Sequence, residues 1–528
     1  MRNWGLSPGR LVPPFQGGAL AGWLGPLAVA LFGGLLRFID LGRPKAVVFD
    51  ETYYVKDAYS LLVEGVERTM LGDAKNPIAD RRLLAGDLDI FKQCPQPDDC
   101  ASFVAHPPLG KWMIAAGEWM FGMNPFGWRF AAAVAGTLTI LILARVARRM
   151  TRSTLLGCLA GLLLALDGLH LVLSRTAILD IFLAFWVLAG FACLVADRDD
   201  MRARLADRHD AALLRGPRLG LRPWRLAAGV CLGAACAVKW SGIFFLLAFA
   251  LLSLVWDAGA RRALGAREAY RGTLAYDGPG AAGAFALVPV LTYVASWSGW
   301  FATSRGWGRN WDQATSSGNP LFFAFDSVRS WLDYHVQVLG FHSGLETPHP
   351  YMSEPWSWPL LLRPVAFFYK GEKSGCGAAD CAQAVIGVGT PALWYGSAVA
   401  LVALVAWYAA TRDWRAGAVL LTYAAGWLPW FYYAVADNRT MYLFYMAPVL
   451  PFMVLAVVLV AGLVLGRRDA PPARRAVGAA VVGAFALIVL VNFWWLQPVL
   501  SAETISYAQY WARMLLSSWV STSTTSPT

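Results

Sequence analysis

Long uninterrupted apolar runs restrict what this chain can fold into. Residues 20–39, 178–196 and 446–465 each approach or reach the ~20 apolar residues that a helix needs to cross the hydrocarbon core of a bilayer. Hydrophobic residues make up 57% of the chain and charged residues 15%, whereas soluble globular chains carry about 25% charged residues. The sequence therefore predicts an all-α, polytopic membrane protein.

The distribution of Lys and Arg predicts the orientation of the helices. Basic residues gather at the N-terminus and in short segments at 145–152, 198–225, 261–271, 412–415 and 467–475. Short cytoplasmic loops carry an excess of Lys and Arg, so we place these segments in the cytoplasm. About eleven spans follow from this rule, with residues 1–19 inside and a tail, 501–528, outside. The expected spans are 20–39, 130–147, 155–173, 178–196, 226–238, 241–256, 281–297, 391–410, 416–434, 442–465 and 477–496.

Two long segments, 40–128 and 299–390, fall on the outer side under this arrangement, while every cytoplasmic connection stays short. Segments of this length are usually functional rather than simple connections. An apolar stretch at 107–123 interrupts the first of them. We interpret this stretch as an interfacial or re-entrant helix, because counting it as a span would turn the basic segment 145–152 outward.

Cysteine positions provide an independent indication of the same topology. Four of the eight cysteines fall in the outer segments as two close pairs, Cys94 with Cys100 and Cys376 with Cys381. Disulfides persist outside the cytosol, so we expect one bridge in each segment. The alternatives are four free thiols or a metal site, although the intervals between these cysteines differ from those of zinc knuckles.

Two adjacent carboxylates, Asp50 and Glu51, follow the first apolar run. They are expected where a spanning helix ends and water begins, which suits an enzyme that acts on a lipid-borne substrate. We expect Asp50 to act as a general base toward a hydroxyl nucleophile. Adjacent side chains on a helix diverge by about 100°, so Glu51 is expected to position the acceptor backbone or a cation instead. The alternative is a helix cap or a pair of solvated acids.

Six basic residues are expected near the same membrane face as the acid pair. They are Lys111, Arg129, Arg175, Lys239, Arg363 and Arg439. A lipid phosphate at this depth needs cationic partners, because a charge that leaves water without one costs several kcal/mol. Each residue could instead reach lipid headgroups or neutralise a helix end. As a set, they predict a phosphate-binding site.

Two further residues, His106 and Asp180, are candidates for the same site. His106 precedes two prolines and could donate a hydrogen bond to a phosphate or a sugar, or stiffen its loop. Asp180 is expected one turn inside a span, where an unpaired charge is costly. We therefore expect it to pair with Arg175 or Lys111.

Other classes of site are not indicated by the sequence. His335, His342 and His349 are spaced by seven residues without an acid in register, so we expect loop packing or acceptor contacts, and no metal. No Walker loop occurs, so no nucleotide cofactor is expected and an activated group should arrive on a lipid carrier. The net charge of +11 reflects cytoplasmic loops near anionic lipid rather than nucleic-acid binding.

Six short motifs occur in chain order. They are residues 49–54 (FDETYY), 106–111 (HPPLGK), 174–180 (SRTAILD), 238–242 (VKWSG), 355–365 (PWSWP with LRPV) and 437–442 (DNRTMY). Together they resemble the polyprenyl-phosphate-mannose protein O-mannosyltransferases, which are membrane enzymes of glycosyltransferase family 39 with a GT-C fold. The resemblance runs from about residue 20 to residue 500, so 20–500 is expected to form one GT-C transmembrane catalytic domain.

The resemblance implies transfer of mannose from a polyprenyl phosphate to Ser or Thr hydroxyls of exported proteins, with inversion at the anomeric carbon. The paired acid of the family maps onto Asp50 and Glu51. The segment 299–390 has no room for the β-rich MIR domain of the eukaryotic members, so a bacterial form is expected. The richness in Ala, Gly and Arg resembles that of actinobacterial proteins. The enzyme would act at the outer face of the plasma membrane, alone or with the protein export channel.

Two other functions stay open at this point. A related GT-C enzyme could transfer a sugar from the same carrier to a lipid or a cell-wall glycan, and only the acceptor groove would differ. A transporter would show inverted repeats and broken helices at midplane depth. Here the ionisable residues gather toward one face instead.

Overall fold

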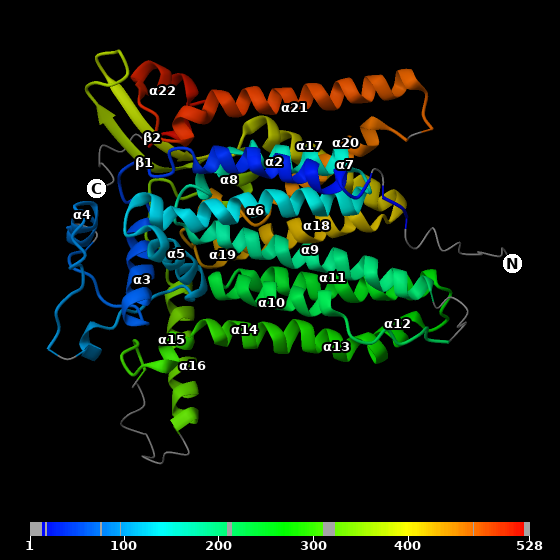
Figure 1. Cartoon of the computed structure of the whole chain (residues 1–528), viewed down its shortest axis with the longest axis horizontal. Helices are drawn as coiled ribbons and strands as arrows, with labels where there is room; N and C mark the ends of the chain where they lie inside the picture. The colour runs from blue at the N-terminus through cyan, green and yellow to red at the C-terminus, as the bar shows by residue number, and fades with distance from the viewer. Residues whose placement is uncertain are drawn as a thin grey trace.

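The computed structural model describes residues 13–15, 18–73, 76–95, 97–207, 214–309, 323–467 and 469–521. Long helices lie side by side along one axis, and shorter elements gather at one end of this bundle (Figure 1). Within the described residues, seven helices are long and apolar enough to cross a membrane. They are Ala21–Phe38 (α2), Pro125–Thr151 (α6), Leu179–Ala206 (α9), Gly242–Ala263 (α11), Ala269–Ser296 (α12 to α14), Pro391–Thr411 (α17) and Pro472–Leu500 (α21).

Shorter helices complete the bundle. Three are apolar, namely α7 (Thr154–Ala165), α10 (Pro223–Val238) and α20 (Leu450–Leu465). Two others, α18 (Trp414–Trp427) and α19 (Pro429–Ala436), meet where Pro429 cannot continue the hydrogen-bond ladder. Each expected span has a helical counterpart in chain order. The count of eleven stays a prediction, because length and composition alone do not assign the shorter helices to spans.

Two further expected spans, besides the one divided at Pro429 and the one at 442–465 that begins with the short η6 (Leu443–Met446), are not regular helices. The span expected at 155–173 is divided into α7 and α8 (Gly168–Leu173), because the Asp167 side chain accepts a hydrogen bond from the His170 amide and begins a new helix. The span expected at 281–297 lies in a helical stretch that alternates α and π turns. Its parts are α12 (Ala269–Gly272), η2 (Thr273–Asp277), α13 (Gly278–Ala282), η3 (Gly283–Leu287) and α14 (Val288–Ser296).

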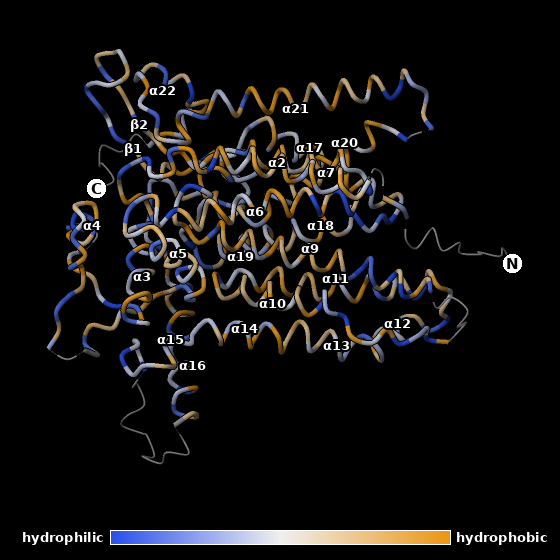
Figure 2. Tube along the Cα trace, in the orientation of Figure 1, coloured by the Kyte–Doolittle hydropathy of each residue, from blue (hydrophilic) through white to orange (hydrophobic). Residues whose placement is uncertain are grey.

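Both of the long segments expected on one side lie at the same end of the bundle (Figure 1). The first holds α3 (Glu51–Glu64), α4 (Ile78–Leu84), η1 (Pro97–Cys100) and α5 (Leu109–Phe121); the second holds α15 (Ser298–Ala302), α16 (Phe323–Ser343) and η5 (Pro355–Leu360). The remaining short elements are η6 (Leu443–Met446), α22 (Tyr507–Arg513) and η7 (Ser517–Trp519). Figure 2 shows hydrophobic residues along the bundle helices and more hydrophilic residues toward their ends.

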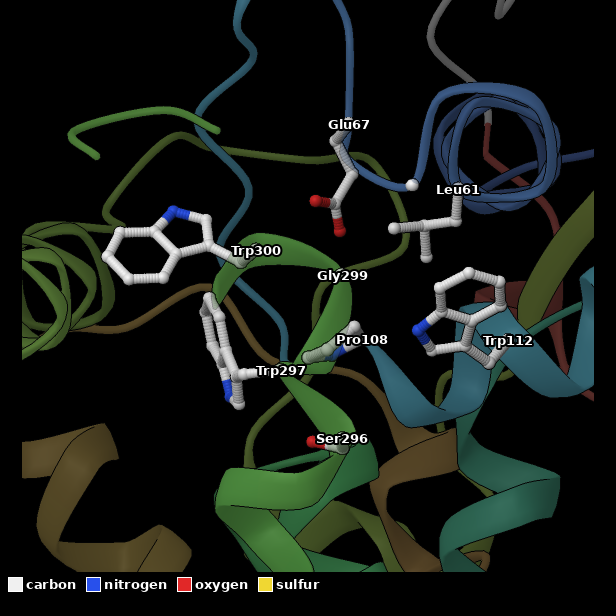
Figure 3. Close-up of a pocket in the computed structure, with 9 residues that line it drawn as sticks. Leu61, Glu67, Pro108, Trp112, Ser296, Trp297, Gly299 and Trp300 are labelled. Carbon is white, nitrogen blue, oxygen red and sulfur yellow. The ribbon is translucent and has the colours of Figure 1, made fainter. Parts of the chain in front are cut away.

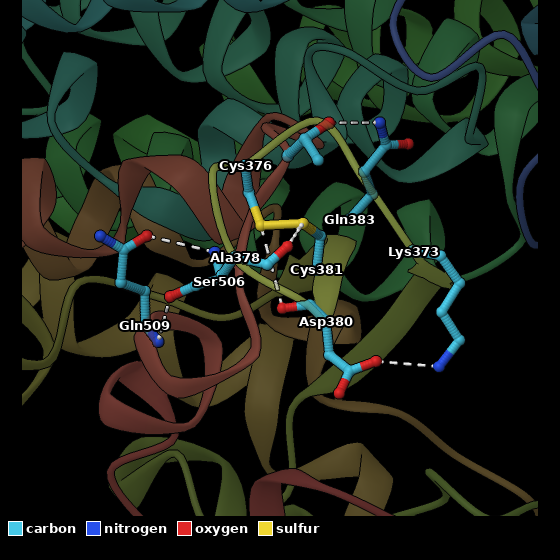
Figure 4. Close-up of a disulfide and its surroundings, with 9 residues drawn as sticks. Lys373, Cys376, Ala378, Asp380, Cys381, Gln383, Ser506 and Gln509 are labelled. Atoms are coloured by element: carbon cyan, nitrogen blue, oxygen red, sulfur yellow. Dashed lines mark hydrogen bonds and ion pairs between the residues drawn. A yellow bond between two sulfur atoms is a disulfide. The ribbon is translucent and has the colours of Figure 1, made fainter.

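A small antiparallel sheet adds strands to the expected helical fold. Its order is β1 (Val365–Glu372), β2 (Cys381–Gly387) and β3 (Ile505–Ser506). The bridge between Cys376 and Cys381 closes the β1–β2 hairpin, and the ion pair of Lys373 with Asp380 lies beside it (Figure 4). A second bridge joins Cys94 and Cys100. The structure therefore has both of the disulfides expected from the sequence.

A buried ion network ties the other ends of the bundle helices together. It consists of Asp197, Arg222, Arg225, Asp257, Arg261 and Asp277, which come from α9, α10, α11, η2 and the residue before α10. Arg222 donates to Asp197 at 3.0 Å and to Asp257 at 2.7 Å. Burying charges is tolerable only when each one is paired, so the network restricts how these helices can shift.

Thiol labelling tests the predicted side of the hairpin end. In intact cells, a membrane-impermeant maleimide should leave the chain unlabelled until an impermeant reductant is added, because Cys94, Cys100, Cys376 and Cys381 are paired. Reduction should then expose all four thiols, which can be counted by mass spectrometry. The Cys376→Ser, Cys381→Ser double variant should label at only the other pair. Labelling before reduction would contradict the bridges, and no labelling after reduction would contradict the topology.

Candidate active site

Asp50 lies immediately before α3, at the end of the bundle. Phe49, which precedes it, has a φ of 48°, a left-handed conformation that bulky residues rarely adopt. The Phe49 ring packs against Phe367 of β1, with ring centroids 4.9 Å apart, and against Tyr442 at 5.8 Å. Such backbone strain persists only where the surroundings impose it. Aromatic packing from two distant segments therefore helps to fix where Asp50 lies.

Lys239 and Asp180 form an ion pair beside Asp50. The Lys239 ammonium, at the turn between α10 and α11, donates to the Asp180 carboxylate in the first turn of α9 at 2.7 Å. The expected pairing of Asp180 with Arg175 or Lys111 is therefore corrected. The reason is that the α10–α11 turn brings an ammonium to the start of α9, while both expected partners are bound elsewhere.

The Asp50 carboxyl is suited to accept a proton. Burial raises its pKa from 3.8 to about 6, and the positive charge of Lys239 opposes this rise. The Asp180 charge raises the pKa further, whereas the Tyr54 hydroxyl lowers it. A carboxylate with a pKa near 6 is ionised at neutral pH and still close enough to the working pH to be an efficient base.

His106, His342 and Arg439 lie near Lys239 and extend the charged group around Asp50. The rings of His106, before α5, and His342, on α16, are 5.3 Å apart, and the His106 ring is 6.0 Å from the Tyr54 ring. Arg439 donates to the His342 carbonyl and to His342 Nδ1, the latter at 3.1 Å. Burial holds the pKa of His106 well below its ordinary value, helped by the charge of Lys239. Burial and Arg439 lower the pKa of His342 to about 4, so both rings are neutral.

Glu51 makes a separate, fully buried contact. Arg129 donates from Nε to Glu51 Oε1 at 2.8 Å and from Nη2 to Oε2 at 2.9 Å, and neither residue is exposed. The amides of Val48 and Ala177 also donate to the Glu51 carboxylate, each at 3.0 Å. The partner of Glu51 is thus a cation, one of the two kinds of partner expected for it.

Three further cations donate to other parts of the chain. Arg175 donates to the carbonyl groups of Arg37 and Ile39 at 2.8 and 2.6 Å, at the C-terminus of α2. Lys111 pairs with Glu67 and lies 3.8 Å from Asp57. Arg363 donates to the Ser518 carbonyl at 2.8 Å, against the C-terminal segment. Of the six expected cations, the structure therefore brings Lys239 and Arg439 to the group around Asp50 and His106. Lys111 also lies close enough for its charge to lower the pKa of His106, although its ammonium is paired with Glu67.

With this geometry in place, comparison with known proteins is informative. The family model described as dolichyl-phosphate-mannose-protein mannosyltransferase matches residues 27–264. The model of the C-terminal four-transmembrane region of protein O-mannosyltransferase matches residues 327–519. The chain belongs to the protein O-mannosyltransferase family.

Relatives match this mannosyltransferase over nearly its whole length. It is 39% identical to a polyprenol-phosphate-mannose–protein mannosyltransferase of Mycolicibacterium smegmatis, over 97% of this chain and 96% of that one. It is 33% identical to the protein of the same description from Corynebacterium glutamicum, over 93% and 92%. The family expected from the sequence motifs is confirmed.

The fold is shared with a distant solved structure. One chain of the Saccharomyces cerevisiae Pmt1–Pmt2 protein O-mannosyltransferase complex, bound to the sugar donor, superimposes with a TM-score of 0.70. Identity is 14%, over 96% of this chain and 93% of that one. The expected GT-C membrane fold is confirmed by this likeness.

A small cavity lies next to the Lys111–Glu67 pair of this mannosyltransferase. Its volume is ≈ 10 Å³, and Trp112, Trp297 and Trp300 contribute to its lining. Figure 3 shows the Glu67 carboxylate pointing into it. Such a volume has room for about one water molecule, so this cavity cannot hold a sugar.

Several residues of the site were not singled out from the sequence. Tyr54 lies one helical turn after Asp50, and this spacing is a signal that could have found it. The Tyr445 ring lies 5.4 Å from the Lys239 ammonium, and only the tertiary structure reveals that contact. The sequence predicts loop packing or acceptor contacts for His342, whereas this residue lies on α16 and contacts Arg439. Across the described ranges, no cluster of His, Cys, Asp or Glu is arranged to hold a metal ion.

The Glu51–Arg129 pair should matter for folding more than any exposed pair. The change Glu51→Gln leaves a fully buried guanidinium without its counter-charge, which costs about 3–5 kcal/mol of unfolding free energy. The matched control is Glu64→Gln, which breaks a half-exposed pair with Arg305 and should cost about 1 kcal/mol or less. Denaturant unfolding in detergent measures both. Equal losses would contradict the assigned role.

Proposed function

We propose that this chain transfers mannose from polyprenyl-phosphate-mannose to Ser or Thr hydroxyls of exported proteins, with Asp50 as the general base. The reaction inverts the anomeric carbon and takes place at the extracytoplasmic face of a bacterial plasma membrane. The observation that carries the proposal is the position of Asp50 beside Lys239, in a chain of this family. Arg439 lies in the same group, through His342 and His106.

The chemistry assigns a task to each of these groups. As the acceptor hydroxyl oxygen bonds to mannose C1, its proton passes to the Asp50 carboxylate. The bond from C1 to the phosphate oxygen breaks, and its electron pair leaves with the lipid phosphate. Attack opposite the leaving group inverts C1. A positioned base of this kind typically contributes 10²–10⁴-fold in rate.

The departing phosphate gains negative charge, and fixed cations stabilise it. The Arg439 Nε and His106 Nδ1 atoms are buried and have no hydrogen-bond partner among the described residues. Both are therefore available to a phosphate or sugar oxygen, because a buried polar atom without a partner is unfavourable until a ligand supplies one. Lys239 supplies a further positive charge, and its pairing with Asp180 balances that charge within the protein.

Arg129, Arg175, Lys111 and Arg363 fit this scheme less directly. Their nitrogen atoms donate to carboxylates or carbonyl groups of the chain itself. A phosphate contact by any of them requires one of these bonds to open. We therefore assign phosphate binding to Lys239 and Arg439, with the other four as supports of the surrounding helices.

The arrangement of charge supports an extracytoplasmic site. The basic segments 145–152, 198–207 and 261–271 lie at helix ends away from Asp50, where α6 and α9 end. Short cytoplasmic loops carry such an excess of Arg, so the Asp50 end faces outward, with a cytoplasmic N-terminus and an outer C-terminal tail. A lipid-linked donor makes a separate cofactor unnecessary, and an exported polypeptide reaches this face alone or at the export channel.

Replacement of the base tests the assignment. Purified protein in proteoliposomes, given polyprenyl-phosphate-mannose and a Ser/Thr peptide, should form mannosyl peptide detectable by mass spectrometry. Asp50→Asn should lower kcat by 10²–10⁴-fold, because it removes the proton acceptor and little else. Donor binding and thermal unfolding should stay unchanged. The control Asp89→Asn, at an exposed acid in the first long segment, should turn over normally.

Two results would contradict this proposal in different ways. Near-normal turnover by Asp50→Asn would remove Asp50 from the base role. Mannose transfer to lipid or glycan acceptors, with none to peptide, would favour the alternative acceptor class and keep the donor chemistry.

The pH dependence follows from the pKa of Asp50. The base must be ionised, so kcat/KM should fall tenfold per pH unit below about pH 6. Lys239→Gln removes the charge that lowers this pKa, so the midpoint should move to higher pH. The control Lys56→Gln, at a lysine paired with Asp80, should leave the midpoint in place. A midpoint that stays or falls in Lys239→Gln would exclude this electrostatic coupling.

A further inference from the structure

Helix α16 carries an apolar stripe that the described chain leaves uncovered. Its members recur every three or four residues, so they share one helix face. They are Phe325, Val328, Leu332, Val336 and Leu339, with exposed fractions of 63, 47, 53, 67 and 60%. Five large apolar side chains in one continuous row are more than the scattered exposure that soluble surfaces show.

The opposite face of α16 packs on the protein. Tyr334 and Val338 are 2% and 3% exposed. The Tyr334 ring lies 5.2 Å from the ring of Trp297, which follows the last turn of α14, and Trp331 lies 6.1 Å from the same ring. The uncovered stripe is therefore not the side that holds α16 in place.

The two flanks of α16 differ in character. Successive residues turn by about 100°, which places Asp326, Asp333 and Gln337 together on one flank. The other flank carries His335, whose ring stacks on Trp240 at the α10–α11 turn, with centroids 5.7 Å apart. His335 Nε2 also lies 2.8 Å from the Tyr293 hydroxyl of α14. The histidine flank thus faces the ends of the bundle helices, and the acidic flank faces away from them.

The direction of α16 relates the stripe to the bilayer. In Figure 1, α16 runs across the axis of the bundle and projects beyond α14. The Trp331 and His335 rings of α16 contact Tyr293 of α14. Helix α14 ends a membrane-length stretch, and its Val290 and Leu291 are 57% and 59% exposed. A helix that lies across the axis at this level lies in the plane of the membrane interface. An amphipathic helix in that plane buries its apolar face at the boundary of headgroups and acyl chains.

We propose that α16 is an interfacial membrane helix whose apolar stripe contacts the acyl-chain boundary of the leaflet at the Asp50 end. The stripe continues the lipid-facing surface of α14, and this continuity favours lipid over a second protein as its occupant. The helix also fixes the depth of Arg439 relative to the membrane, because Arg439 donates to the His342 carbonyl and ring near the end of α16. The lipid contact does not depend on the proposed function, whereas the role of Arg439 rests on it.

Lipid quenching tests the contact directly. Leu332→Cys and Gln337→Cys are made in a full-length background in which Cys158, Cys193, Cys231 and Cys236 are replaced by Ala. Each is labelled with an environment-sensitive fluorophore and placed in nanodiscs. Lipids brominated near the top of the acyl chain should quench the label at 332 severalfold more than the label at 337, whose emission should respond to aqueous iodide.

Two outcomes would overturn the proposal. One is equal quenching at both positions. The other is disulfide cross-linking of Leu332→Cys between two copies with loss of quenching, which would assign the stripe to a protein interface.

A second pair of variants tests the link to Arg439. Leu332→Asp with Val336→Asp should weaken binding of polyprenyl-phosphate-mannose about tenfold, the scale of one charge-assisted hydrogen bond. The control, Asp333→Asn with Gln337→Ser on the acidic flank, should bind the donor normally. Binding is measured by equilibrium dialysis, so it does not require turnover. Unchanged donor affinity in the first variant would contradict the claim that α16 positions Arg439.

Discussion

The buried contact between Glu51 and Arg129 is the interaction on which the arrangement of the site depends. One carboxylate accepts hydrogen bonds from the guanidinium of α6 and from the amides of Val48 and Ala177. It thereby joins the start of α3 to two parts of the bundle that are far apart in sequence. Because neither charge is exposed, each needs the other, and α3 can begin at only one place. Asp50, one residue earlier, is held at the bundle end as a consequence.

Charge is distributed differently at the two ends of the molecule. At the far end, Arg222 is bound by Asp197 and Asp257 in a network that restrains the helices. At the Asp50 end, Lys239 is neutralised by Asp180, while Arg439 Nε and His106 Nδ1 are buried and have no hydrogen-bond partner among the described residues. Arg225 Nε and Asp257 Oδ1 of the far network also lack a hydrogen-bond partner within the part of the chain that the structure describes. The unpartnered nitrogens of Arg439 and His106 therefore indicate an anion site only together with the Lys239–Asp180 pair beside Asp50.

The sequence predicted most of the architecture, because apolar length and arginine position are one-dimensional properties. Helices at nearly all of the long runs, both disulfide pairs and the common end of the two long segments could be read from residue order. The broken helices could not. The interruption at Asp167 depends on an amide of its own helix and on Thr390, which donates to the same carboxylate from far along the chain. The short sheet needs β2 to meet β3, more than a hundred residues away.

By itself, the sequence determined the class of protein, the family and the identity of the acid pair, since these follow from composition, motif order and adjacency. Tertiary structure alone decided which cations lie in the group around Asp50 and His106. All six expected cations satisfied the same sequence criterion, namely a basic residue near one end of a span. Arg175 donates to carbonyl groups at the end of α2, Lys111 pairs with Glu67, and Lys239 pairs with Asp180 beside Asp50. Helix packing decides which cation lies near Asp50, because each charge pairs with the nearest opposite charge or carbonyl group in space. The order of residues in the chain does not specify these distances.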